Sequence, residues 1–224
     1  MFRKKHSLIK GTLILTSAGL VSRVLGFFFR IFLSHTFGEE QVGLYQLIFP
    51  FYALCLSLST SGLETAISRS VSRFHSLGRT QDGKLIFKTG LILSVLISLI
   101  CTFLVQENSV FLSNRFLGDP RCAALLYLIV LALPAASVHS CICGYHYGLQ
   151  STSVPAISQL LEQFVRISSV FVLYFIFLHS GVHPEISLAV SGIIFGEFAA
   201  AGYSLFSLKK SCCEIGRASC RERV

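Results

Sequence analysis

The chain has 224 residues, of which 53% are hydrophobic and only 13% are charged, and its mean hydropathy is +0.68. Soluble domains carry about 25% charged residues, so the composition excludes an ordinary soluble domain and indicates a membrane protein. The net charge of +8 does not indicate nucleic acid as a partner. The charges cluster in short segments between apolar runs, and the aromatic residues are not interleaved with Lys and Arg.

Six apolar stretches are long enough to cross a bilayer, which takes about 20 residues. They cover residues 9–33, 43–67, 85–105, 121–148, 155–179 and 185–208. We therefore predict an all-α polytopic membrane protein with six transmembrane helices. Pro50 and Pro134 predict kinks in the second and fourth helices, with neighbouring helices satisfying the freed carbonyls. The first stretch resembles a signal peptide, but its length, its arginines and the lack of a small-residue cleavage site favour a retained helix.

The first stretch carries a small and cationic stripe formed by Gly19, Arg23, Gly26 and Arg30. Positions seven apart lie nearly in register on a helix, and a charge in hydrocarbon is costly. One interpretation is that the stripe faces a wet cavity and attracts an anion. In the other, Arg30 reaches the outer interface, Arg23 pairs with a carboxylate and the glycines permit close packing. The mid-membrane depth of Arg23 favours the cavity; for Arg30 both interpretations stay open.

Two acidic residues are candidates for binding a coupling proton or sodium ion, which intramembrane carboxylates can do. Glu64 lies in the second stretch, where it can instead pair with Arg69 at the interface. Glu197 lies in the sixth stretch and follows Gly192 and Gly196, a spacing that first indicates helix packing.

The fourth stretch places His139, Cys143 and His146 on one helical face. The two histidines are two turns apart, about 10.5 Å of rise. Since a zinc–nitrogen bond is about 2 Å, one ion cannot reach all three, and we expect no metal site there. The eight cysteines show no paired spacing that indicates a disulfide framework. No phosphate loop or nucleophile–base pair stands out, so we expect neither a cofactor nor enzymatic activity.

The fifth stretch repeats the polar arrangement with Gln159, Glu162, Arg166 and Ser169 along one face. Glu162 and Arg166 have the i, i+4 spacing of an ion pair. The pair either neutralises itself or acts as a charge switch that opens when a charged ligand arrives.

The basic residues favour one orientation. Eleven Lys and Arg lie at the N-terminus, between the second and third stretches and after the sixth, against two, Arg115 and Arg121, on the other side. Cytoplasmic segments carry the excess of Lys and Arg, so both ends of residues 1–213, the predicted six-helix lobe, should be cytoplasmic. Residues 214–224, "EIGRASCRERV", resemble the translation of a sequencing adapter, and we expect the native chain to continue beyond about residue 213.

Three blocks strongly resemble the polysaccharide-exporter and lipid-II-flippase branch of the MOP exporter superfamily. They are "KGTLILTSAGLVSRVLGFFFRIFLSHTFGEEQVGLYQL" (10–47), "TSGLETAISRSVS" (60–72) and "SQLLEQFVRISSV" (158–170). The resemblance covers roughly residues 7–210 and implies the first of two six-helix lobes facing a central cavity. The family's helix-1 arginine matches Arg23. Relatives often have an arginine where this chain has Cys143 and a proline where it has Glu64. These two differences leave open which cargo the protein carries.

The resemblance implies that the protein moves an undecaprenyl-diphosphate-linked glycan precursor across the cytoplasmic membrane by alternating access. The substrate-binding residues would then be Arg23, Arg30, Gln159, Glu162 and Arg166. An ion gradient, with a proton or sodium ion as the coupling ion, or the membrane potential would drive transport. The alternatives are a drug/cation antiporter of the same superfamily, which favours acids at the centre of its cavity, and a non-transport membrane scaffold. Polar stripes on two helices argue against a scaffold, since lipid-facing helices need none.

Overall fold

The computed structural model describes residues 2–181 and 184–221, and these form helices without any strand. In chain order the helices are α1 (Phe2–Phe37), α2 (Glu39–Ser76), α3 (Thr80–Glu107), α4 (Ser109–Leu112), the π-helical turn η1 (Ser113–Leu117), α5 (Cys122–Ile129), the 3-10 turn η2 (Val130–Ala132), α6 (Leu133–Gly148), α7 (Ser153–His179) and α8 (Ser187–Arg221). Six segments are long and apolar enough to cross a membrane, with α5 to α6 counting as one. The all-α prediction with six spans is confirmed.

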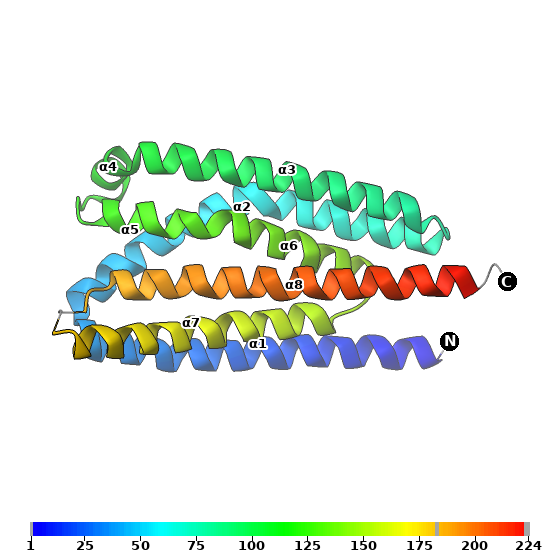
Figure 1. Ribbon diagram of the computed structural model, residues 1–224, viewed down its shortest axis with the longest axis horizontal. Helices are drawn as coiled ribbons and strands as arrows, with labels where there is room; N and C mark the ends of the chain where they lie inside the picture. The colour runs from blue at the N-terminus through cyan, green and yellow to red at the C-terminus, as the bar shows by residue number, and fades with distance from the viewer. Residues whose placement is uncertain (1, 182–183, 222–224) are drawn as a thin grey trace.

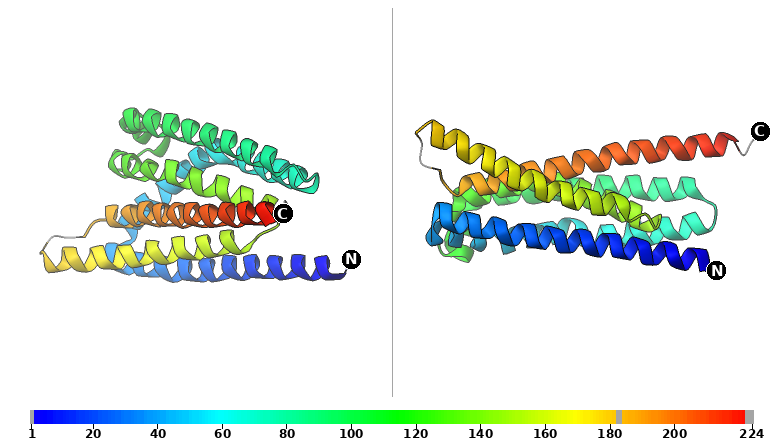
Figure 2. Two further views of the ribbon diagram at one scale, coloured as in Figure 1. Left: turned by 45° about the vertical axis from the view of Figure 1, so that its right-hand side comes forward. Right: turned by 90° about the horizontal axis from the view of Figure 1, so that it is seen from below.

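The helices run roughly along one axis in two groups (Figure 1). Helices α2, α3 and α6 pack against one another, and α1 packs along α7. Helix α8 connects the groups because it contacts both α6 and α7. The turn from α2 to α3 lies at the same end of the bundle as the start of α1 and the end of α8 (Figure 1, Figure 2). Gly38, with φ of 80°, is the only residue between α1 and α2.

Apolar side chains cover the outside of the bundle, while several small polar residues lie inside. Leu58 is 69% exposed and Phe206 is 70% exposed. By contrast, Ser94, Ser98 and Thr102 are buried along one face of α3. Hydroxyl groups between membrane helices form interhelical hydrogen bonds, and Ser94 donates one to the carbonyl of Ser59 at 3.0 Å. This distribution suits a lipid environment and confirms a multi-pass membrane protein.

The fourth span is interrupted where Pro134 was expected to disturb it. The span divides into α5, the 3-10 turn η2 and α6, and Pro134 lies in the first turn of α6. Proline has no N–H to donate to the carbonyl four residues earlier, here that of Val130. This carbonyl accepts from the backbone N–H of Leu133 and from the Oγ1 of Thr102 on α3, the latter at 3.1 Å, so a neighbouring helix contributes to satisfying it, as predicted. Helix α2, by contrast, continues through Pro50.

Glycines allow the closest helix contacts. A Cβ atom at Gly144 would lie 2.8 Å from the carbonyl oxygen of Glu64, and one at Gly148 would lie 2.8 Å from that of Ser68. On α8, a Cβ atom at Gly192 would overlap the side chain of Val170, and one at Gly196 would lie 2.9 Å from the carbonyl oxygen of Glu162. The packing interpretation of the glycines before Glu197 is therefore confirmed.

Substituting Gly196 with alanine should destabilise the bundle, because the new methyl group meets the backbone of α7, which cannot move independently. Overpacking of this kind costs about 1–3 kcal/mol. Thermal unfolding in detergent, followed by far-UV circular dichroism, measures the loss. Gly202→Ala on the same helix is the matched control, since a Cβ atom there meets nothing within 4 Å. Equal midpoints for the two variants would contradict the close contact.

Candidate functional site

A cavity of about 520 Å³ opens between α1, α2 and α7. Three arginines line it: Arg23 and Arg30 from α1, and Arg166 from α7. We call this space the cationic cavity, since no carboxylate occurs among the described residues that line it. Polar groups of Ser22, Gln46 and Gln163 complete the wall. Pro50 lies in the same wall, and its missing N–H leaves the carbonyl of Gln46 without its usual helical partner.

Arg166 is held in the cationic cavity with unused hydrogen-bonding capacity. Its Nη2 pairs with Glu162, and its Nη1 donates to the Oε1 of Gln163 at 3.3 Å. Its buried Nε has no hydrogen-bond partner in the described part of the chain. Arg23 and Arg30, by contrast, are exposed on α1. Because a guanidinium group has no acceptor and several donors, these groups suit an anion with several oxygens.

Gly26 brings α1 close to α7 at this level. A Cβ atom there would lie 3.3 Å from the Nε2 of Gln163, so a larger residue would require the end of this side chain to shift. Gly19, the other glycine of the predicted stripe, does not line the cationic cavity. The glycine-and-arginine stripe therefore faces α7 only over its C-terminal part, from Arg23 onwards.

A second cavity of about 310 Å³ lies between α2, α6, α7 and α8. Glu64, Glu162 and Glu197 line it together with His139, and no Lys or Arg occurs among the described residues of its wall. We call it the acidic cavity. Glu64 accepts a hydrogen bond from the Oγ of Ser140 at 2.6 Å. Glu64 thus lies in the wall of the acidic cavity, and within the described part of the chain it forms no ion pair with Arg69.

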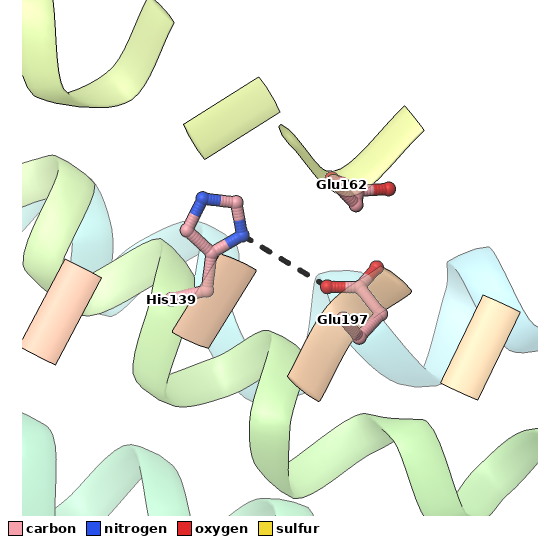
Figure 3. Close-up of side chains that lie close together, drawn as sticks. All are labelled: His139, Glu162 and Glu197. Atoms are coloured by element: carbon pink, nitrogen blue, oxygen red, sulfur yellow. Dashed lines mark ion pairs between the residues drawn. The ribbon is translucent and has the colours of Figure 1, made fainter. Parts of the chain in front are cut away.

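His139, Glu162 and Glu197 converge in the acidic cavity from three helices (Figure 3). Each offers a ligand atom within 4.8 Å of the other two. The Nδ1 of His139 lies 3.9 Å from the Oε2 of Glu197, whose side chain is only 9% exposed. The Oε1 of Glu197 lies 3.5 Å from the hydroxyl group of Tyr52. Sequence spacing along α6 alone missed this group, because the partners of His139 come from α7 and α8.

The ion pair between Glu162 and Arg166 joins the two cavities, since Glu162 faces the acidic one and Arg166 the cationic one. Both side chains are mostly buried, with exposures of 18% and 15%. In a low-dielectric interior each charge depends on the other, and removing one leaves an uncompensated buried ion.

The polar stripe on α7 is therefore divided. Arg166 joins Arg23 and Arg30 in the cationic cavity, whereas Gln159 and Glu162 line the acidic one. Two further members of predicted polar sets, Ser169 and His146, line neither the cationic nor the acidic cavity. The Oγ of Ser169 bonds the carbonyls of Val165 and Arg166, and His146 is buried with its Nε2 unpaired among the described atoms.

Comparison with known proteins identifies the chain's relatives. The pattern of the polysaccharide biosynthesis protein family matches residues 8–220. The chain belongs to this family. Within it, the chain is 36% identical over 205 residues to stage V sporulation protein B of Bacillus subtilis (strain 168), covering 92% of this chain and 40% of that protein.

Two further relatives come from the same organism. The chain is 26% identical over 208 residues to the lipid II flippase MurJ, covering 89% of this chain and 36% of the relative. It is 24% identical over 212 residues to the uncharacterized membrane protein YabM, covering 92% of this chain and 39% of the relative. The chain thus spans about 40% or less of the length of these family members. No solved structure matches it.

Neutralising Arg166 should show how the two charges depend on each other. Arg166→Gln leaves Glu162 and Glu197 facing each other without a cation, and we expect a loss of about 3 kcal/mol in the free energy of unfolding. Adding Glu162→Gln should recover most of this loss. Thermal unfolding of both variants in detergent measures the difference.

The exposed pair of Arg79 and Asp82, whose side chains are 67% and 40% exposed, provides the control. Neutralising Arg79 there should change the stability by less than about 1 kcal/mol. A double variant of Arg166 and Glu162 that is no more stable than R166Q alone would contradict the charge-pair account.

Proposed function

We propose that the chain forms the first lobe of a flippase that moves an undecaprenyl-diphosphate-linked cell-wall or polysaccharide precursor across the cytoplasmic membrane. The observation that carries this proposal is the cationic cavity, in which Arg23, Arg30 and Arg166 face one space without a carboxylate in its described wall. The names of the relatives, a lipid II flippase among them, support it. On this view the protein is a transporter and not an enzyme.

The charge of the proposed cargo explains why arginines would be placed here. A diphosphate loses its hydration when it leaves the membrane surface, and the cost rises steeply in a medium of low dielectric constant. Guanidinium groups offset that cost because they bind phosphate oxygens through paired hydrogen bonds. The exposed guanidinium groups of Arg23 and Arg30 offer such donors in the cavity wall, whereas the Nε of Arg166, which has no partner among the described residues, is buried.

We further propose an orientation for the chain, based on the distribution of Lys and Arg. The ends of the bundle differ in charge, with eleven Lys and Arg on the side of the N-terminus and two on the other. The positive-inside rule then places the N-terminus in the cytoplasm. At the opposite end, Arg121 pairs with Glu40 at 2.7 Å, which reduces the positive charge facing outward. Facing a second lobe, the cationic cavity would open first to one side of the membrane and then to the other as the lobes rock around it.

The acidic cavity supports a second candidate, a drug/cation antiporter. Its described wall has three glutamates and a histidine but no Lys or Arg, and this composition suits an organic cation. This cavity is the smaller of the two, at about 310 Å³ against 520 Å³. Drug-sized ligands occupy pockets of about 300–1,000 Å³, so the volume alone leaves room for only the smallest of them.

Substituting Arg23 with alanine should weaken the binding of undecaprenyl diphosphate to the purified chain at least about tenfold, the loss expected for one charge-assisted contact. Native mass spectrometry in detergent measures this binding. Arg115→Ala is the matched control, since Arg115 lies in the exposed turn η1 and should have no effect. Undecaprenol, which lacks the diphosphate, should bind equally to the parent and to R23A.

Two results would contradict the flippase. One is equal affinity of R23A and R115A for undecaprenyl diphosphate. The other is binding of tetraphenylphosphonium in preference to the lipid, which would favour the antiporter. In a protein that also carries a second lobe, R23A should abolish complementation of a flippase-deficient strain while its amount in the membrane stays unchanged.

A further inference from the structure

We propose that the acidic cavity binds a divalent transition-metal ion through His139, Glu162 and Glu197. One nitrogen and two carboxylates converge there from α6, α7 and α8 (Figure 3). Imidazole together with carboxylate is a ligand set typical of divalent ions such as zinc and manganese. Glu197 is the most enclosed of the three, since its side chain is only 9% exposed and points to the other two.

The separation between the imidazole and the nearest carboxylate suits an ion between them. The 3.9 Å from the Nδ1 of His139 to the Oε2 of Glu197 exceeds the roughly 3.2 Å limit of a good N–H···O hydrogen bond. Two metal bonds of about 2.0–2.2 Å each span this gap at an obtuse angle. The widest separation in the group, up to 4.8 Å, exceeds what two such bonds span, so the side chains would have to move closer together around an ion.

Ser158 orients the imidazole ring for this role. Its Oγ donates to the carbonyl of Pro155 at 2.9 Å, so the oxygen is available to accept from the Nε2 of His139 at 3.0 Å. A proton on Nε2 leaves the Nδ1 lone pair facing Glu162 and Glu197. Metal-binding histidines in proteins characteristically donate their second N–H to an oxygen in this way. When Nδ1 carries no proton, its lone pair and the two carboxylates repel one another unless a cation lies between them.

The surroundings supply what an ion needs beyond three ligands. The acidic cavity of about 310 Å³ has room for water molecules as further ligands. Glu64 lies in the same wall and adds negative charge, while no Lys or Arg among the described residues lines it. The nearest competing cation is Arg166, which reaches Glu162 from the cationic cavity.

Metal binding should therefore be linked to the anion site. An ion that takes Glu162 as a ligand weakens the hold of Glu162 on Arg166, whose guanidinium group then turns its full charge to the cationic cavity. By thermodynamic linkage, an anion that binds Arg166 must favour the metal ion in return. This coupling rests on the proposed flippase function, whereas the metal site itself requires no lipid cargo.

Binding of Mn²⁺ to the purified chain, measured by electron paramagnetic resonance in detergent, tests the site. Manganese is chosen because the chain has eight cysteines, whose thiolates favour zinc, and a purification tag without histidine avoids a second site. We expect His139→Asn and Glu197→Gln each to weaken the binding at least tenfold. Arg166→Gln should strengthen it several-fold, whereas Arg166→Lys, which keeps the charge, should stay close to the parent.

Exposed residues outside the cavity serve as matched controls: His179→Asn and Glu107→Gln should bind Mn²⁺ as the parent does. Far-UV circular dichroism and gel filtration check the fold, and Glu162→Asp replaces Glu197→Gln if the latter does not fold. An Mn²⁺ affinity of H139N equal to that of the parent overturns the proposed site. This holds even if the carboxylate variants lose binding, because the ion would then be bound by carboxylates alone. The Mn²⁺ experiment contains no undecaprenyl diphosphate, so its failure would overturn only the metal site. The flippase proposal is tested separately by the lipid affinities of R23A and R115A.

Discussion

The ion pair between Glu162 and Arg166 is the interaction on which the polar interior depends. Its partners lie one turn apart on α7, yet they face different cavities. Each charge compensates the other, so removing either partner would leave an uncompensated ion in the bundle interior. The pair places its negative charge in the acidic cavity and its positive charge in the cationic cavity, and its ion-pair contact links the two cavities directly.

The packing of α7 against its neighbours makes this arrangement possible. Gly26 on α1 and Gly196 on α8 let these helices pack close to α7. A side chain at position 26 would meet the end of Gln163, and one at position 196 would meet the backbone of Glu162. Close helix contacts built on small residues are a general means of association in lipid, where burial of apolar surface gives little driving force. The glycines thus hold the charged residues of α7 at fixed positions relative to α1 and α8.

Helix α7 lies between two cavities of opposite charge, and the proposed metal and anion sites lie one in each. Cation binding on one side and anion binding on the other compete with the same internal pair, so each event favours the other without any long conformational pathway. The relatives are more than twice as long as the matched part of the chain, which spans about 40% or less of them. In a two-lobe protein, the second lobe would close the cationic cavity opposite Arg23.

The sequence by itself determined the six spans, the cationic face of α1 and the packing role of Gly192 and Gly196, because hydropathy and helical periodicity depend only on neighbours along the chain. Only the tertiary structure decided which faces meet. It divided the α7 stripe between two cavities, since α1 lies on one side of α7 and α8 on the other. It also brought His139 close to Glu162 and Glu197, which helical spacing within α6 cannot predict because these residues lie on three different helices.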